Sequence, residues 1–290
     1  MYGFHISIEK KSFKKSVEQN HKLYNINAVQ LFARNPRQLK VVEYRNEDAE
    51  ECRKYVSENN LFLVSHATYL LNSANITNQS EETINSALND LIYAEKLGAI
   101  GSVFHVGKHL KLSKEEGLDN MFKSISTIIQ NLQDNNIKSI YILETSSGAG
   151  TELLSKIDDL GKFYHRFTDK QKENIKICID TCHVFAAGYM LNSESDSQNF
   201  IDIVEEHISW KNVILLHLND SKKGCDCHVD RHENIGEGCI SKESDVGLAH
   251  LSRHCAKNSI AIILETPFSH FIRSGELQRI KEWITESTDK

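Results

Sequence analysis

Short apolar runs recur along the whole chain, and most of their residues are β-branched or large aliphatic. Eight such runs are present, and the segments between them are long enough for a loop, a helix and a return loop. They read as continuous apolar stretches, which is typical of parallel strands buried on both faces. The pattern predicts an α/β protein, a TIM (β/α)8 barrel. The runs begin at Gly3, Asn27, Phe62, Ser102, Ser139, Ile175, Val213 and Ile260.

Two of the intervening segments carry clear helix signals. Ser113 precedes Glu116 at the spacing of a capping box, which predicts a helix start. Residues at helical spacing then follow it: Leu118, Met121, Phe122, Ile125, Ile128, Ile129 and Leu132. A second helix is predicted to open at Asn78 to Glu81, and its expected apolar face comprises Ile84, Leu88, Leu91 and Ile92.

Length and composition are those of one large domain. The chain has 290 residues, of which 40% are hydrophobic and 26% charged, and barrels of about 250 residues commonly form a single domain. Only two prolines occur, Pro36 and Pro267, and no Gly/Ser-rich tract interrupts the alternation of elements. We therefore expect residues 1–290 to form a single domain.

The sequence favours a reducing compartment inside the cell. No apolar stretch approaches the roughly 18 residues that span a membrane. The first apolar run leads at once into a segment with four lysines, which leaves no room for a signal peptide. Seven cysteines at irregular spacing favour reduced thiols. We expect a protein of the cytoplasm or nucleus that is neither secreted nor bound to a membrane.

Most of the cysteines are interpreted as packing residues. We expect burial or partial burial of Cys52, Cys178, Cys182, Cys239 and Cys255. The segment Cys225-Asp226-Cys227-His228 offers soft ligands close together, but without a distant partner these do not close a tetrahedral site. A flexible loop is the preferred interpretation of this segment.

Histidines and carboxylates gather at the C-terminal ends of the apolar runs and on the loop after the seventh. Because strand ends meet at one rim of a barrel, all nine of these histidine, aspartate and glutamate side chains should lie together. Histidine with Asp and Glu, without thiolates, suits zinc, manganese or iron. His5 could contact the ligands from the first strand, and His109 could share a turn with His105, but neither is predicted to bind metal. The predicted ligands are His66, His105, Glu144, Asp180, His183, His217, Asp230, His232 and Glu265.

The net charge of -6 at first disfavours a nucleic-acid substrate, because phosphate binding requires local positive charge. Four of the acidic residues are predicted ligands, however, and three divalent ions would bring the formal sum to about zero. Basic residues also follow the strand ends and are expected on the same rim: Arg34, Arg37, Lys40, Lys108, Lys222, Lys223 and Arg231. The net charge therefore does not exclude DNA.

Seven segments, in order, resemble the signature segments of the endonuclease IV family of apurinic/apyrimidinic (AP) endonucleases. They are HATYLLN from His66, FHVGKH from Phe104, LETSSGAGTEL from Leu143, IDTCHVFAAGY from Ile179, LHLNDSK from Leu216, DRHENIGEG from Asp230 and LETP from Leu264. The resemblance covers nearly the whole chain, and DTCH with DRH is a highly specific combination. One departure is that Val106 and Lys108 replace a proline and a small polar residue.

The resemblance implies three divalent metal ions in a TIM barrel, usually zinc, with manganese as an alternative at one or more positions. Glu144 would bridge the first two ions. The other ligands would be His66 and His105 for the first ion, Asp180, His217 and Glu265 for the second, and His183, Asp230 and His232 for the third.

The implied activity is DNA base-excision repair. Such an enzyme hydrolyses the phosphodiester 5′ to an abasic site, leaves a 3′-hydroxyl and a 5′-deoxyribose phosphate, and also removes 3′-blocking groups. Glu144 and Glu265 would be catalytic, and Arg37, Tyr69 and Leu70 would enter the base stack of a double-stranded DNA. Without the resemblance, a surface arginine and a tyrosine packed beside the metals would be the simpler interpretation. The protein is expected to act as a monomer.

The alternative from another reaction class is a metal-dependent sugar isomerase or epimerase on a related barrel. Glu144, Asp180, His217 and Glu265 would suffice for such a site, which leaves the remaining five predicted ligands unexplained. A non-catalytic DNA-damage or metal-binding protein is disfavoured by the complete ligand set. Metal stoichiometry separates the two enzymes: about three ions for the nuclease, and one or two for the isomerase.

Overall fold

Eight parallel strands form a closed barrel, as the apolar runs predict. The computed structural model describes residues 1–9, 12–39, 46–75 and 80–285. Around the barrel the order is β1-β10-β7-β6-β5-β4-β3-β2, and pairing of β1 with β10 closes it. The strands are β1 (Tyr2–Ile6), β2 (Ala28–Phe32), β3 (Phe62–His66), β4 (Gly101–Phe104), β5 (Ile140–Glu144), β6 (Ile175–Asp180), β7 (Val213–His217) and β10 (Ala261–Leu264).

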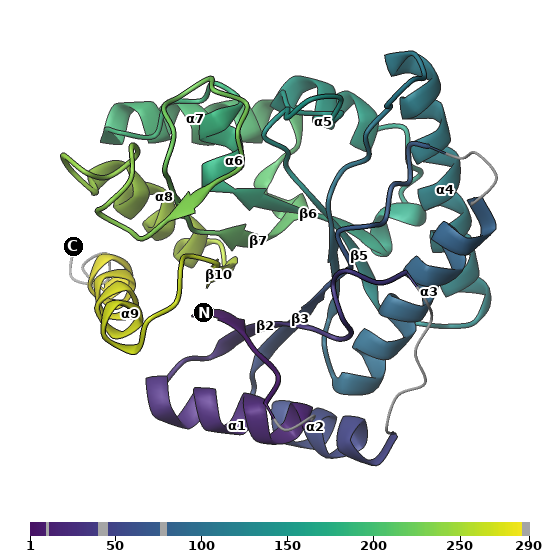
Figure 1. Ribbon diagram of the computed structural model, residues 1–290, viewed down its shortest axis with the longest axis horizontal. Helices are drawn as coiled ribbons and strands as arrows, with labels where there is room; N and C mark the ends of the chain where they lie inside the picture. Colours follow the sequence, from purple (N-terminus) through teal and green to yellow (C-terminus); the bar gives the residue numbers. More distant parts are fainter. Residues whose placement is uncertain (10–11, 40–45, 76–79, 286–290) are drawn as a thin grey trace.

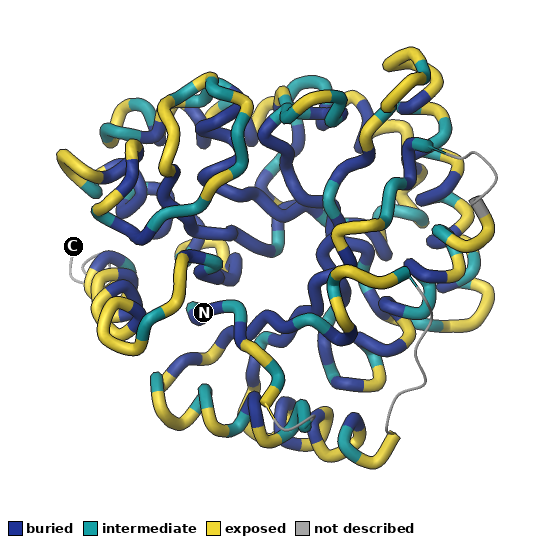
Figure 2. Tube along the Cα trace, viewed as in Figure 1, coloured by how far each residue is buried: buried dark blue, intermediate teal, exposed yellow. Residues whose placement is uncertain are grey.

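Helices surround the barrel, and exposed residues lie along these helices and on the loops (Figures 1 and 2). They are α1 (Phe13–Tyr24), α2 (Asn46–Glu58), α3 (Ser80–Leu97), α4 (Lys114–Asp134), α5 (Ile157–Tyr164), α7 (Glu194–His207), α8 (Val246–Lys257) and α9 (His270–Thr285). Three further elements lie in the loops after β6 and β7: the short helix α6 (Thr181–Ala186) and the two-stranded sheet of β8 (Asp220–Ser221) and β9 (His232–Glu233). No helix in the described ranges is long and apolar enough to cross a membrane.

The capping box at the start of α4 is confirmed. The Ser113 hydroxyl accepts from the Glu116 backbone N–H at 3.2 Å, and the Glu116 carboxylate accepts from the Ser113 N–H at 2.9 Å. The apolar face expected for α3 is partly wrong, because Ile92 is 37% exposed. Each residue turns a helix by about 100°, so Ile92 lies roughly opposite the buried Asp90 and Ala94. Asn78 lies outside the described residues.

Apolar side chains pack in two places, between the strands and the helices and inside the barrel. Side chains two residues apart on a strand point to the same face, so the set inside the barrel defines which residues face inward. All of its members are fully buried. They are Ala28, Val64, Val103, Ile142, Cys178, Leu215, Ala261 and Ile263. The inward position that follows this layer on each strand lies at the C-terminal rim.

Candidate metal centre

A ring of polar side chains forms the last inward-facing layer of the barrel. Each member lies two residues after Gly3 or after an apolar residue of the layer below, and therefore points to the same side. Six of the eight are predicted ligands, whereas His5 and Gln30 are not. The ring consists of His5, Gln30, His66, His105, Glu144, Asp180, His217 and Glu265.

The other three predicted ligands lie on the loops above the ring. His183 is on α6, which begins immediately after β6, and the Asp180 side chain caps this helix by accepting from the His183 N–H at 2.9 Å. Asp230 lies just before β9, and His232 begins it. The structure thus brings all nine together at one rim. Seven of them line a cavity of about 740 Å³.

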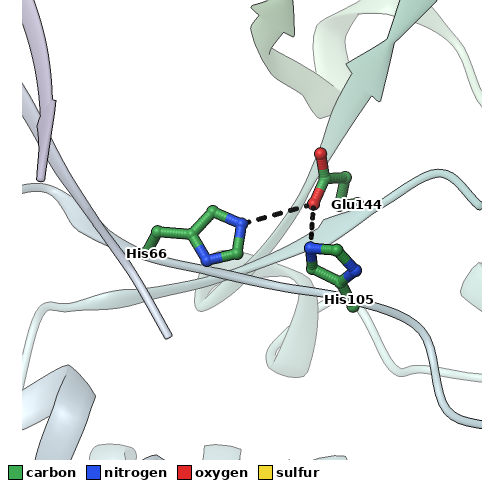
Figure 3. Close-up of side chains that lie close together, drawn as sticks. All are labelled: His66, His105 and Glu144. Atoms are coloured by element: carbon green, nitrogen blue, oxygen red, sulfur yellow. Dashed lines mark ion pairs between the residues drawn. The ribbon is translucent and has the colours of Figure 1, made fainter. Parts of the chain in front are cut away.

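His66, His105 and Glu144 form the first ligand group (Figure 3). Glu144 Oε2 lies 3.5 Å from His66 Nε2 and 3.3 Å from His105 Nε2. The Nδ1 of His66 is 2.9 Å from the Ala67 carbonyl. A carbonyl only accepts, so Nδ1 carries a hydrogen, and Nε2, which faces Glu144, is the ring nitrogen left for a metal.

The second group combines Glu144 with Asp180, His217 and Glu265. His217 Nδ1 lies 2.7 Å from Glu144 Oε1, 3.2 Å from Glu265 Oε2 and 3.8 Å from Asp180 Oδ2. The two oxygens of Glu144 therefore face different groups. This arrangement allows one carboxylate to contact two ions.

His183, Asp230 and His232 form the third group. The Asp230 carboxylate lies between the two rings, with Oδ2 3.2 Å from His183 Nε2 and Oδ1 3.2 Å from His232 Nε2. His183 Nδ1 donates to the Thr145 carbonyl at 2.8 Å, so its Nε2 is left for a ligand bond.

The electrostatics of the three groups favour ionised carboxylates. Burial opposes the charge of Glu144, but His217 and His105 hold the pKa of this carboxyl well below its usual range. Burial likewise opposes a charge on His232, yet Asp180 and Asp230 raise its pKa to about 9. Protons therefore occupy nitrogens at which a metal ion would bind, and metal binding would release them.

Two buried ligand atoms have no hydrogen-bond partner: Glu144 Oε2 and His232 Nε2. Leaving a buried polar atom unpaired costs roughly 1–3 kcal/mol. Both atoms belong to groups in which nitrogen and oxygen donors lie within 4.8 Å of one another. This donor set, with its unsatisfied atoms, fits divalent metal ions such as zinc.

Two amide side chains at the site were missed by the sequence analysis. Asn219 donates to Asp180 Oδ2 at 2.7 Å and accepts from the Glu265 backbone N–H at 2.9 Å. Gln30 bonds to His217 and Glu265. The signal for Gln30 was its place in the strand register, two residues after the inward-facing Ala28. His5, expected near the site, lies with Nδ1 3.5 Å from Glu265 Oε1.

The residues predicted to contact DNA lie on two adjoining loops. Tyr69 and Leu70 are 56% and 50% exposed. The Tyr69 ring lies 5.6 Å from that of His66 and lines the cavity. Its backbone N–H donates to the Pro36 carbonyl at 3.0 Å, which places the loop with the exposed Arg37 beside it.

The expected cluster of basic residues is only partly present. Arg34 is buried and pairs with Asp90 at 2.6 Å, so its placement on the exposed rim was wrong. Lys108 and Lys222 are exposed but pair with Glu152 and Glu233. Of the remaining residues, Lys223 and Arg231 are exposed, Arg231 lines the cavity, and Lys40 lies outside the described residues.

Four of the five cysteines expected to be buried are so, and Cys239 is exposed instead. It precedes the buried Ile240 in a loop whose backbone N–H groups bond to the Asp220 carboxylate. Within the described ranges, neither Cys225, Cys227 nor His228 belongs to a group of potential ligands. His228 Nδ1 instead donates to the Ser147 carbonyl at 2.9 Å.

Comparison with known proteins places this chain in one family. A family profile described as "Xylose isomerase-like TIM barrel" matches residues 20–287, so the chain belongs to this class of TIM-barrel proteins. "Probable endonuclease 4" of Symbiobacterium thermophilum is 34% identical over 91% of this chain and 92% of its own. Endonuclease IV from Thermus thermophilus aligns in structure with a TM-score of 0.82 and 26% identity, covering 98% and 99% of the two chains. The chain belongs to the endonuclease IV family.

The same barrel architecture is present in a solved structure described as epimerase-like. A D-tagatose 3-epimerase-like protein aligns with a TM-score of 0.73 over 99% of both chains, at 18% identity. Likeness at this level shows the fold alone, because one barrel hosts many chemistries. The comparison confirms the predicted barrel and leaves the function to the site.

Proposed function

We propose that this chain hydrolyses the phosphodiester on the 5′ side of an abasic site in double-stranded DNA and leaves a 3′-hydroxyl and a 5′-deoxyribose phosphate. As a member of the endonuclease IV family it is a metal-dependent AP endonuclease, a hydrolase. One observation carries the proposal. The three ligand groups lie side by side at one cavity, and Glu144 belongs to two of them.

Three divalent ions fit these groups, with zinc as the expected metal and manganese as an alternative at one or more positions. Such ions activate water, neutralise charge on phosphoryl oxygens and stabilise a departing oxygen. His66, His105 and Glu144 would hold the first. The second would be held by Glu144, Asp180, His217 and Glu265, and the third by His183, Asp230 and His232.

Glu144 and Glu265 are the proposed catalytic residues. Glu144 is fully buried and fixes the separation of the first two groups, because its oxygens face His105 and His217 respectively. Glu265 lines the cavity, and its Oε2 faces the second group while its Oε1 is held by Gln30. Its carboxylate is therefore placed to bind the second ion and to orient the water that attacks phosphorus. Removal of 3′-blocking groups is proposed as a second activity of the same site, because it breaks the same kind of bond.

Arg37, Tyr69 and Leu70 are proposed to recognise the lesion. A planar or apolar side chain can fill the space of a displaced nucleotide, and unstacking costs least where a base is missing. Tyr69 and Leu70 are exposed beside the cavity, and the loop of Arg37 adjoins them. We further propose that residues 1–290 act as one domain and as a monomer, in the reducing environment of the cytoplasm or nucleus.

The sugar isomerase alternative uses the second ligand group alone. Its weakness is that the first and third groups supply five further ligands that such a reaction does not need. Elemental analysis of the purified protein distinguishes the two. About three ions per chain are expected for the nuclease, and one or two for the isomerase.

The decisive experiment is incubation of the metal-replete protein with an end-labelled duplex that carries one abasic-site analogue. We expect cleavage on the 5′ side of the site and a 3′ end that a polymerase extends. An undamaged duplex of the same sequence is the control. An intact abasic duplex, or cleavage only on the 3′ side by β-elimination, would contradict the proposal.

A further inference from the structure

Gln30 is fully buried in the polar ring and makes three hydrogen bonds there. Its Nε2 lies 2.6 Å from Glu265 Oε1 and 2.9 Å from His5 Nδ1. Its Oε1 lies 2.8 Å from His217 Nε2. One amide thus joins two proposed ligands of the same ion, although it is on β2, a strand that contributes no ligand.

The chemistry of these partners fixes the orientation of the amide. An ionised carboxylate only accepts hydrogen bonds, so the NH2 group of Gln30 must face Glu265. Its carbonyl oxygen then faces His217 and accepts from Nε2–H. Nε2 of His217 therefore carries a hydrogen, and Nδ1 is the ring nitrogen left for a metal. Nδ1 is also the nitrogen that faces Glu144 and Glu265, at 2.7 and 3.2 Å.

We propose that Gln30 is a positioning residue that selects the metal-binding tautomer of His217 and aims one oxygen of Glu265 at the second group. The proposal rests on the metal site of the proposed function. With Oε1 of Glu265 held by the amide, Oε2 remains for the ion. Gln30 itself has no nitrogen or oxygen to spare for a metal, because both are already bonded.

Replacement of a residue that hydrogen-bonds to a metal ligand typically lowers metal affinity by 10–100-fold. In Gln30→Ala, His217 and Glu265 both lose their support. In Gln30→Glu the shape is kept, and the new carboxylate can accept from His217 but repels Glu265. We expect both variants to bind one of the three ions about 10–100-fold more weakly and the other two as the parent does.

The test is a titration of the full chain with zinc in competition with a chromophoric chelator. Gln133→Ala serves as the matched control, because the Gln133 amide also makes hydrogen bonds, to the Lys170 carbonyl at 2.7 Å and to Asn174 Oδ1 at 3.2 Å, but contacts no proposed ligand and lies near the C-terminal end of α4. Circular dichroism of each metal-free variant shows whether it is folded at the temperature of the titration. Unchanged zinc affinity in folded Gln30→Ala and Gln30→Glu would overturn the proposal.

The tautomer of His217 gives a second test that needs no variant of Gln30. In ¹⁵N spectra of the zinc-loaded parent labelled at histidine, with His217 assigned by a His217→Gln sample, we expect a directly bonded hydrogen on Nε2. A hydrogen on Nδ1 would refute the proposal even if Gln30→Ala failed to fold. Neither test contains DNA. A parent that binds zinc as expected but leaves abasic duplex intact would overturn the proposed function and leave the role of Gln30 standing.

Discussion

At the scale of single residues, Glu144 is the side chain on which most of the site depends. It contacts a histidine from β3, another from the β4 end and a third from β7, and it is fully buried. A carboxylate with both oxygens inside such a cluster is stable as an anion only while positive charge surrounds it. Glu144 therefore does not serve as a packing residue, and its position suits it to bridge two metal ions.

Replacement of Glu144 should remove two ions and the activity together. We expect Glu144→Ala to retain about one ion of three, at the third group, and to cleave abasic duplex at least about 100-fold more slowly than the parent. Elemental analysis and incision assays measure the two effects. Glu282→Ala, at an exposed position of α9, should keep all three ions. Full metal content in Glu144→Ala would contradict the assignment.

Replacement of Arg37 or Tyr69 should weaken binding of abasic DNA without changing the metal content. Stacking of a base on an aromatic side chain is worth about 1–3 kcal/mol, so Tyr69→Ala should weaken binding to abasic duplex by roughly 10-fold or more. Arg37→Ala should weaken it similarly, and its affinity should depend less on salt if the guanidinium also meets phosphate.

Metal content is the control for both recognition variants and should remain at the parental value. Arg37 is the cleaner test, because the Tyr69 ring also packs near the rings of His66 and His105. Fluorescence titrations at two salt concentrations give the affinities. Equal binding of abasic duplex by both variants and the parent would leave Arg37 and Tyr69 as ordinary surface and packing residues.

Sequence reasoning found residues whose chemistry is rare at strand ends and missed those whose chemistry is common. A histidine or carboxylate at the end of a buried strand, such as His66 or Glu144, has few structural explanations. An amide such as Gln30 or Asn219 has many, and its importance depends on which atoms it faces. Arg34 was misplaced for a similar reason, because its partner Asp90 lies on another element and leaves no local signal.

At the scale of elements, each strand positions one chemical group through simple alternation. An inward apolar residue anchors the strand, and the next inward residue, two positions later, enters the site. On β1 the lower position is Gly3, and a Cβ there would lie 1.7 Å from the Ala28 carbonyl oxygen of β2. Only glycine lets these two strands approach so closely that His5 and Gln30 meet at the rim.

The loop that carries Arg37 is tied to α3 by a buried ion pair. Arg34 donates to both oxygens of Asp90, at 2.6 and 2.8 Å, and to the Leu39 carbonyl at 2.8 Å. Burial raises the pKa of Asp90 in spite of the neighbouring Arg34, so the pair itself contributes little net stability. Its effect is to fix the loop that contains Arg37.

Breaking this pair from one side should be costly. Asp90→Ala leaves a buried guanidinium without its partner, and we expect the free energy of unfolding to fall by about 3–5 kcal/mol. Urea titration followed by circular dichroism measures it. Lys54→Ala, which removes an exposed i,i+4 pair with Glu58, is the control and should change stability by less than about 0.5 kcal/mol. A loss below about 1 kcal/mol in Asp90→Ala would show that the pair does not hold the loop.

At the scale of the whole molecule, the barrel could be predicted because every strand repeats one signal. Eight apolar runs fix the number of strands, and polar residues at their ends fix which rim is functional. The insertion after β7 could not be predicted in shape, because β8 and β9 are only two residues each and depend on the buried Asp220 carboxylate for their loop. Such a loop is defined by hydrogen bonds between distant residues, and periodicity does not report them.

The charge of the whole chain leads to the last prediction, because a chain of net charge -6 binds a phosphate substrate only where positive charge gathers locally, and bound ions would supply such charge at the cavity. Removal of the ions takes the charge of three divalent cations away from the rim where Glu144, Asp180, Asp230 and Glu265 lie, and histidines that take up protons replace only part of that charge. An ion present at 100 times its dissociation constant stabilises a fold by about 2.7 kcal/mol. For a chain of 290 residues that corresponds to roughly 4–5 °C per ion. We therefore expect chelation to lower the unfolding temperature by at least this amount and to abolish binding of abasic duplex, and we expect added zinc to restore both.

Calorimetry and binding titrations on the same samples measure the two effects, and elemental analysis verifies that the metal has been removed. If protein shown to be free of metal unfolds at the parental temperature and binds abasic duplex as before, the ions contribute neither to the fold nor to recognition.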